Sequence, residues 1–170
     1  REPVGMSGVR LEAKVHIVTG AVSAAQNITK CVRRCGLELG DIVLEQIASS
    51  HAVLTEDEKE LGVCMVDIGG GTADIAIFTE GSIRYTNVIP IAGDHVTNDV
   101  AVALRTPIQH AEQIKIEHGE IYFNTNSTEE VIEVPSVADR PPKKVQKLAL
   151  SQIITARYEE LFSLVAQSLR

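Results

Sequence analysis

Three consecutive glycines, Gly69 to Gly71, lie between two apolar segments and constrain the fold more than any other feature of this chain. Residues 63–68 have the composition of a buried strand, and residues 72–78 resume an alternating strand pattern. A glycine turn between two such strands lets backbone N–H groups converge on a phosphate without side chains in the way. The sequence therefore predicts a phosphate-binding hairpin.

Two side chains beside the glycines favour this interpretation. Asp67 ends the first strand and is placed to hold Mg²⁺ through its waters, since that ion prefers one or two carboxylates plus phosphate oxygens. Thr72 adds a hydroxyl donor. The alternative is a tight hairpin with glycines at positive φ, but two glycines would suffice for that turn and the acid would be superfluous. A Rossmann fingerprint or a Walker loop would open a helix here, and neither occurs.

The segment VDIGGGTADIAIF is similar to the second phosphate motif of the superfamily that contains actin, sugar kinases and DnaK-type chaperones. The flanking segments VGMSGVRLEAKVHIVTG, ASSHAVLTEDEKELGVCM and TPIQHAEQIKIEHG narrow the match. With them, the chain resembles the FtsA family of bacterial cell-division proteins from about Pro3 to the C-terminus. The resemblance is most specific between Ile47 and Gly119.

This resemblance implies an actin-like (ribonuclease H-like) α/β fold with mixed sheets and helices. In the family's terms, residues 1–45 would end an inserted subdomain 1C, and residues 46–62 would form the interdomain helix. Residues 63–107 would form subdomain 2A with the phosphate hairpin, and residues 108–170 a truncated subdomain 2B. Because the chain starts without methionine and stops inside an amphipathic pattern, we expect an internal fragment of a longer protein.

Local patterns predict further elements before the hairpin. Residues 4–19 alternate as one or two strands would, and residues 41–47 form another strand pattern. A helix is expected from the Ser23 and Gln26 capping box to Gly36, and another over residues 48–54. Thr55 and Glu58 form a second capping box.

After the hairpin, residues 83–91 predict a third strand and hence an antiparallel meander. Helices are expected after Gly93, from Thr106 as N-cap and Pro107 as first residue to Gly119, and over about 147–169. Residues 121–123 and 131–134 predict a hairpin, followed by an extended connector over 135–142.

Three more residues are candidates for nucleotide binding. Gly93 either lets the backbone approach a ligand or merely starts a helix. Glu112 and Lys115 are three residues apart on one helix face, which by physics alone favours a solvated ion pair. The resemblance implies instead that the AEQIK segment holds the ribose and adenine side of ATP, with Mg²⁺ at the phosphates.

Composition excludes some function classes. The net charge of −7 argues against nucleic acid as a principal partner. There is no signal peptide and no apolar run long enough to span a bilayer, and three cysteines are too few for a disulfide framework, so we expect a cytoplasmic chain.

A basic cluster stands out from the acidic remainder. Arg140, Lys143, Lys144 and Lys147 fall within eight residues, and Arg157 follows in the last helix. These residues form either a solvated lysine-rich loop or a docking surface for an acidic peptide. The resemblance implies that the peptide is the C-terminal tail of FtsZ.

The resemblance also implies a biological role. Proteins of this family polymerise, tether the FtsZ ring to the cytoplasmic face of the inner membrane and recruit later division proteins. The membrane contact would use a segment absent from this chain. ATP would act mainly as a structural ligand, with at most weak hydrolysis, since the sequence shows no convincing catalytic base. A pilus-assembly actin-like protein, a DnaK-type chaperone and a sugar kinase are the alternatives.

Overall fold

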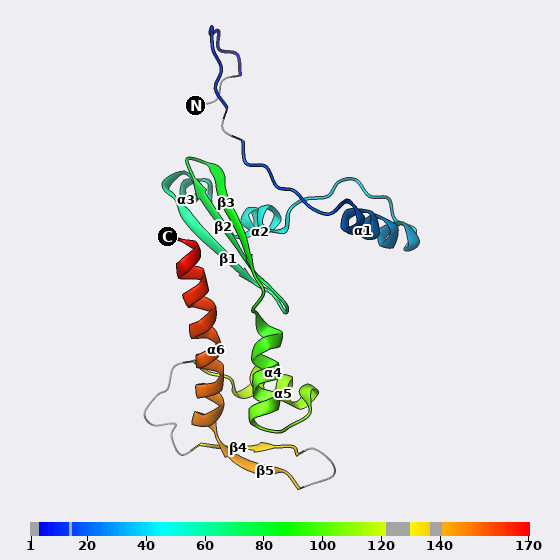
Figure 1. The fold of residues 1–170 in the computed structure, drawn as a ribbon, viewed down its shortest axis with the longest axis vertical. Helices are drawn as coiled ribbons and strands as arrows, with labels where there is room; N and C mark the ends of the chain where they lie inside the picture. The colour runs from blue at the N-terminus through cyan, green and yellow to red at the C-terminus, as the bar shows by residue number, and fades with distance from the viewer. Residues whose placement is uncertain (1–3, 14, 122–129, 137–140) are drawn as a thin grey trace.

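The computed structural model describes residues 4–13, 15–121, 130–136 and 141–170, which form an elongated molecule (Figure 1). Its helices are α1 (Val22–Arg34), α2 (Glu45–Val53), α3 (Glu56–Leu61), α4 (Gly93–Ala103), α5 (Ile108–His118) and α6 (Lys147–Ser168). Its strands are β1 (Val63–Ile68), β2 (Ala73–Thr79), β3 (Ser82–Ile89), β4 (Val131–Val134) and β5 (Lys143–Gln146). Within the described residues, no helix combines the length and the apolar character needed to cross a membrane.

The predicted meander is confirmed: β1, β2 and β3 form an antiparallel sheet in that order. The central strand β2 is buried along most of its length, and its Ile75 side chain is fully enclosed. Glu80 and Gly81 adopt positive φ in the turn to β3, and the ladder shifts register between Ile77 and Phe78. The glycine hairpin lies at the opposite end of β2 from this turn.

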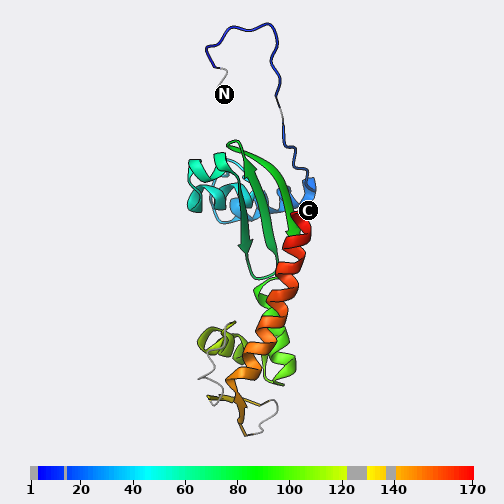
Figure 2. The ribbon, with the colours of Figure 1, turned by 90° about the vertical axis from the view of Figure 1, so that its left-hand side faces the viewer.

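Helix α6 runs from the β4–β5 end of the molecule to the β1–β3 sheet (Figure 2). Near its C-terminus, Leu161 and Val165 pack against Ile75 and Ile89 of the sheet. Near its N-terminus, Leu150 and Ile154 pack into a second apolar cluster, formed with Val96, Val100, Leu104, Ala111, Ile114, Ile132 and Val134. Burial of the apolar surface of α6 at both ends therefore fixes α4 and α5 relative to the sheet.

The second sheet corrects one prediction. Strand β4 pairs with β5, so that Ile132 lies opposite Val145 and Val134 opposite Lys143. The expected partner, residues 121–123, does not supply this strand: Ile121 is a bend, and residues 122 and 123 lie outside the described part of the chain. The lysine-rich segment is not a loop, since Lys143 and Lys144 lie in a strand and Lys147 begins α6.

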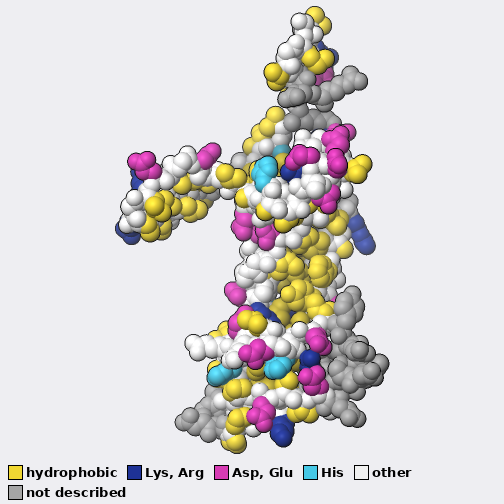
Figure 3. Space-filling model, turned by 180° about the vertical axis from the view of Figure 1, so that it is seen from behind, with side chains coloured by type: hydrophobic (Ala, Val, Ile, Leu, Met, Phe, Trp, Pro, Cys, Tyr) yellow, Lys and Arg dark blue, Asp and Glu magenta, His cyan; other side chains and the backbone are white. Residues whose placement is uncertain are grey.

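The strands predicted near the N-terminus are not formed. The described part of residues 4–21 is irregular and exposed, and residues 41–44 form a loop that leads directly into α2. A strand pattern becomes a strand only when a partner supplies the hydrogen bonds, and no described segment pairs with either stretch. Helix α1 is formed as expected, but it buries no residue and exposes apolar side chains along the projecting arm, including Val22 and Ile28 (Figure 3).

Helix ends match the predictions unevenly. The Thr55 and Glu58 capping box is present, and Gly36 has the expected positive φ of 75°. By contrast, α1 is preceded by Ala21 without a side-chain cap, so the Ser23 capping box was wrong. The N-cap of α5 is Pro107 rather than Thr106, and Gly119 ends that helix with an ordinary φ of −68°.

Candidate functional site

The glycine turn presents free backbone donors. The Gly69 N–H donates to the Thr72 carbonyl at 2.9 Å, which closes the turn. The amides of Gly70 and Gly71 donate to no acceptor among the described residues. The glycines of the described chain that have positive φ are Gly5, Gly36, Gly62 and Gly81, so the hairpin glycines are not there to permit that conformation.

The glycines instead allow a close approach between the turn and the start of α4. The Gly93 N–H donates to the Gly69 carbonyl at 3.1 Å, and the Asp94 N–H donates to the Gly70 carbonyl at 2.8 Å. A Cβ added at Gly70 would lie 3.1 Å from an Asp94 carboxylate oxygen. A Cβ added at Gly71 would meet nothing within 4 Å, so the space beside Gly71 is open to a ligand.

Gly93 also connects the hairpin to α5. Its carbonyl accepts from Lys115 Nζ at 3.3 Å and from the Thr97 hydroxyl at 3.1 Å. Lys115 Nζ in turn lies 2.8 Å from Thr97 Oγ1 and 2.7 Å from Glu112 Oε2. The structure thus brings together Gly69 to Thr72, Gly93, Glu112 and Lys115, which the sequence singled out separately.

The Glu112 carboxylate is held in its charged form. The hydrogen bond from Lys115, followed by that from the Thr97 hydroxyl, lowers the pKa of Glu112 below its usual range. Its side chain is 44% exposed and that of Lys115 is 21% exposed. The pair is therefore fixed in position while one edge remains accessible to a ligand.

On the other side of the hairpin, Asp67 lies directly opposite Asp74 in the β1–β2 ladder. Asp67 Oδ2 accepts from the Ser49 hydroxyl at 2.5 Å, and Asp74 Oδ1 accepts from Gln46 Nε2 at 2.5 Å. The Thr72 hydroxyl donates to Asp74 Oδ2 at 3.1 Å. Helix α2 thereby contacts both strands at the end where the glycine turn begins.

This donor set fits a magnesium ion that is completed by phosphate and water. No group of three or more His, Cys, Asp or Glu within the described ranges is placed to hold a metal. Asp67 Oδ1, however, accepts no hydrogen bond from the described residues, next to a turn with free amides. One or two carboxylates with phosphate oxygens and waters is the usual environment of Mg²⁺.

Sequence reasoning missed several residues of this region: Gln46, Ser49, Asp74, Asp94 and Thr97. One signal was available, because a four-residue turn over 69–72 places residues 67 and 74 opposite each other in a hairpin. The α2 and α4 contacts carry no such local signal, since they depend on how helices dock against the sheet.

The basic residues do not form one patch. Arg140 lies outside the described residues. Lys147 contacts Glu120 at 3.0 Å and Glu130 at 3.2 Å, and these two carboxylates raise the pKa of Lys147. Lys143 and Lys144 have no carboxylate within 4.0 Å among the described residues.

Arg157 lies about 15 Å further along α6 than Lys147, from the rise of an α-helix. It binds Asp99 of α4 through two contacts of 2.6 and 3.0 Å, and it also binds Glu160. The hydrogen bonds to Asp99 raise the pKa of Arg157. Arg157 is therefore engaged in holding α4 against α6.

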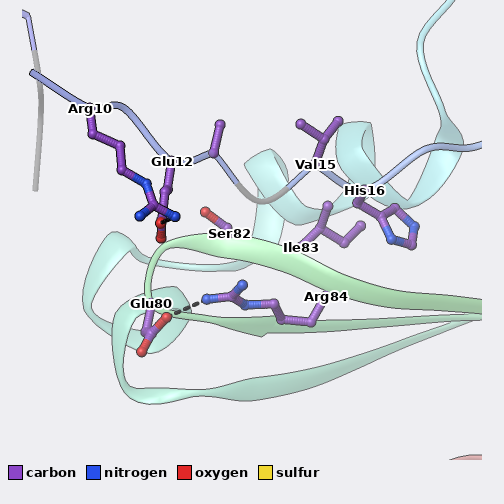
Figure 4. Close-up of a pocket in the computed structure, with 9 residues that line it drawn as sticks. Arg10, Glu12, Val15, His16, Glu80, Ser82, Ile83 and Arg84 are labelled. Atoms are coloured by element: carbon purple, nitrogen blue, oxygen red, sulfur yellow. Dashed lines mark hydrogen bonds and ion pairs between the residues drawn. The ribbon is translucent and has the colours of Figure 1, made fainter.

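A separate cleft of about 790 Å³ lies between the N-terminal arm, which is the irregular segment before α1 and contributes residues 10, 12, 13, 15 and 16 here, and the β2–β3 turn (Figure 4). Its charges are already paired, Arg84 with Glu80 and Arg10 with Glu12. His16 at its end bonds to Thr86 at 3.3 Å. Because these charged groups neutralise one another, the glycine hairpin and not this cleft is the candidate site.

Comparison with known proteins places the chain in a family. The family model described as "Cell division protein FtsA" matches residues 64–169. The FtsA of Pseudomonas aeruginosa is 66% identical over 170 residues, covering 100% of this chain and 41% of that protein. The FtsA of Escherichia coli K12 is 50% identical over 169 residues, covering 99% of this chain and 40% of that protein. The chain thus spans about two fifths of the length of these relatives.

Solved structures show the same fold at lower identity. MreB5 of Spiroplasma citri bound to ADP superposes with a TM-score of 0.71 at 23% identity, covering 88% of this chain and 48% of that one. The PilM–PilN type IV pilus biogenesis complex gives a TM-score of 0.62 at 15% identity, covering 86% and 35%. These likenesses confirm the predicted actin-like α/β fold. The chain belongs to the FtsA family of actin-like cell division proteins.

Proposed function

We propose that this chain supplies the second phosphate turn, the metal carboxylate and the nucleoside-side ion pair of an ATP site. The observation that carries the proposal is the position of Gly93, which bonds to Gly69 through its N–H and to Lys115 through its carbonyl. Gly93 thus joins the open amides of the hairpin to Glu112 and Lys115 in one continuous surface. The MreB5 structures that share the fold contain ADP and AMPPNP, which supports a nucleotide as the ligand.

Each residue has a distinct role in this proposal. The free amides of Gly70 and Gly71 donate to phosphate oxygens, and Gly69 and Thr72 shape the turn that presents them. Gly93 lets the backbone come close, and Glu112 and Lys115 contact the nucleoside. Asp67 holds Mg²⁺ through water, and that ion supplies neutralisation of phosphate charge when it is bound. The nucleotide acts mainly as a structural ligand with at most weak hydrolysis, as the resemblance to the family implies.

At the level of the whole protein, the nucleotide controls assembly. Binding energy shared between two domains biases a hinge, which lets a ligand favour one conformation. In this proposal residues 1–45 end subdomain 1C, and residues 46–62, which form the two helices α2 and α3 and not one continuous helix, connect the domains. Residues 63–107 and 108–170 belong to 2A and 2B. The protein polymerises at the cytoplasmic face of the inner membrane, tethers FtsZ there and recruits later division proteins.

The nucleotide proposal is tested by titrating MgATP into the chain and following ligand NMR signals. The two free amides, of Gly70 and Gly71, can make two charge-assisted hydrogen bonds of about 2–3 kcal/mol each, which together correspond to a dissociation constant of roughly 0.05–1 mM. Gly71→Ala should remove binding without affecting folding, because its Cβ would enter open space at an ordinary φ.

Gly40→Ala is the matched control, since Gly40 also has open space and an ordinary φ but lies in the loop before α2. It should bind as the unmodified chain does. Equal affinity in Gly71→Ala and Gly40→Ala, or no binding at millimolar MgATP, would contradict the proposal.

The FtsZ tail docks, in this proposal, on the β4–β5 sheet. Lys143 and Lys144 have no described carboxylate within 4.0 Å, although Glu133 lies opposite Lys144 in the β4–β5 ladder, whereas Arg157 is already bound to Asp99 and Glu160. Exposed ion pairs contribute about 0.2–1 kcal/mol each, so apolar contacts must supply most of the affinity. The charges mainly increase the association rate. Lys143→Glu with Lys144→Glu should weaken binding of a fluorescent tail peptide at low salt.

The control for the docking test is Lys30→Glu, an exposed residue of α1 far from β5. Binding as tight in the double variant as in this control would show that the tail docks elsewhere. Arg157→Glu is not a suitable test, because it places a carboxylate beside Asp99 and so perturbs the contact between α4 and α6.

A further inference from the structure

Asp67 and Asp74 form a like-charged pair on one face of the β1–β2 hairpin. Residues that are directly opposite in an antiparallel ladder direct their side chains to the same face, about 4.5–5.5 Å apart at Cβ. Like charges so placed repel each other and destabilise the sheet. No Lys or Arg of the described chain lies within 4.0 Å of either carboxylate, so this repulsion is not offset by an ion pair.

The hydrogen bonds to the pair come from neutral donors only. Three of the four carboxylate oxygens accept from Ser49, Gln46 and Thr72. The fourth, Asp67 Oδ1, accepts from no described residue. These bonds orient the carboxylates, but they leave two negative charges without a counter-charge.

Gln46 adds an independent observation. Gln46 is only 3% exposed, yet its side-chain Oε1 has no hydrogen-bond partner among the described residues. A buried acceptor without a donor costs free energy and calls for a bound group. The same amide donates through Nε2 to Asp74, so this unpaired oxygen lies close to the Asp74 carboxylate.

Carboxylate, amide and hydroxyl oxygens together are the hard ligands that Mg²⁺, Mn²⁺ and Ca²⁺ prefer. We infer that Gln46 is a positioning residue for a divalent cation at the Asp67 and Asp74 pair, holding Asp74 through Nε2 and presenting Oε1 to the cation or its water. Ser49 orients Asp67 in the same way from the next turn of α2. This inference rests on the proposed nucleotide site. It implies that α2 contacts the cation of that site through Gln46 and orients Asp67 through Ser49.

The inference is tested with Mn²⁺ alone, without nucleotide, by the loss of the free-ion signal in electron paramagnetic resonance. Gln46→Glu keeps the shape of the side chain, removes the donor to Asp74 and adds a third carboxylate. It should bind Mn²⁺ about tenfold more tightly than the unmodified chain, and its thermal midpoint should be lower without Mn²⁺ and rise more steeply as Mn²⁺ is added. Gln46→Leu should bind Mn²⁺ several-fold more weakly.

Gln152 is the matched control, because it is an exposed glutamine of α6, remote from the hairpin. Gln152→Glu adds the same charge and should leave Mn²⁺ affinity unchanged. A purely structural role for Gln46 predicts that both Gln46 variants lose stability and that neither changes Mn²⁺ affinity, and this result would overturn the inference. If Gln46→Leu does not fold, the Gln46→Glu result decides alone.

The two proposals fail separately. Opposite shifts of Mn²⁺ affinity in the Gln46 variants, with no MgATP binding by the chain, would support the cation site and reject the nucleotide site. If MgATP binding depends on Gly71 but Mn²⁺ affinity is the same in all Gln46 variants, the nucleotide site is supported and the cation inference is rejected. Failure of Mn²⁺ to bind both the unmodified chain and Gln46→Glu also rejects the inference.

Discussion

Replacing Thr97 by valine removes the one hydroxyl that joins the hairpin side of the site to Glu112 and Lys115. Thr97 is 4% exposed, and valine has nearly the same shape, so packing is retained. The single hydroxyl proton has two acceptors within reach, the Gly93 carbonyl and the Glu112 carboxylate, and the hydroxyl oxygen accepts from Lys115. After the change, Lys115 provides the remaining side-chain hydrogen bond to the Gly93 carbonyl.

The magnitude follows from these contacts. Hydrogen bonds to charged groups contribute about 1.5–3 kcal/mol when they are shielded from water. Glu112 is 44% exposed, so water replaces part of the lost interaction, and its share is reduced accordingly. We expect Thr97→Val to lower the free energy of unfolding by about 1–2 kcal/mol at pH 7. Thr97→Ser keeps the hydroxyl and should therefore retain most of the stability that Thr97→Val loses.

The effect should depend on pH in a defined direction. The pKa of Glu112 is lowered in the folded chain, first by Lys115 and then by Thr97, from an ordinary value of 4.5. Stabilisation of this kind is present above the unfolded pKa and is lost as pH falls through the folded pKa. Urea unfolding of both chains at pH 7 and at pH 3 should therefore give a smaller difference at pH 3. Equal stability of Thr97→Val and the unmodified chain at pH 7 would refute this account of the network.

Three other predictions concern the frame around the site. Leu150→Ala empties a fully buried position in the α4–α6 cluster and should lower the free energy of unfolding by about 2–5 kcal/mol in urea titrations. Asp99→Asn breaks a partly exposed ion pair with Arg157 and should cost about 0.5–1 kcal/mol in the same assay, and a larger loss would show a tighter coupling of α4 to α6 than we infer. Thr55→Ala removes the side-chain hydrogen bond to Glu58, so the pKa of Glu58, measured by NMR titration, should rise toward its usual value while the backbone bond keeps it somewhat low.

The elements that could be predicted from sequence are those with strong local patterns. Strands β1 to β3 have apolar periodicity and turn residues that suffice to place them, and α6 has a long apolar stripe. Strand β5 was missed because Val145 is its one apolar residue, and its pairing with β4 joins segments that are distant in sequence. The strands expected over 4–19 and 41–47 show the converse, since an alternating pattern without a partner gives no sheet.

The residues of the candidate site also fall into those that sequence could predict and those that depend on tertiary contacts. The glycine turn, Asp67 and Thr72 form a continuous motif, and Glu112 and Lys115 lie on one helix turn, so both could be selected from sequence. Their meeting through Gly93 depends on how α4 docks against the turn, which involves two backbone hydrogen bonds and no side-chain pattern. The part played by Gln46 depends on α2 reaching across to β2, and sequence spacing does not indicate that contact.

The most direct test of the nucleotide site is a map of backbone amide shifts, recorded by ¹H–¹⁵N NMR as MgATP is added to the chain. The account predicts that the largest shifts fall at Gly70, Gly71 and Gly93 and on the α5 turn that carries Glu112 and Lys115. The amides of α1 should not move, and the same map with Gly71→Ala should be flat. Shifts centred on the cleft between the N-terminal arm and the β2–β3 turn, with the hairpin amides unchanged, would contradict the account.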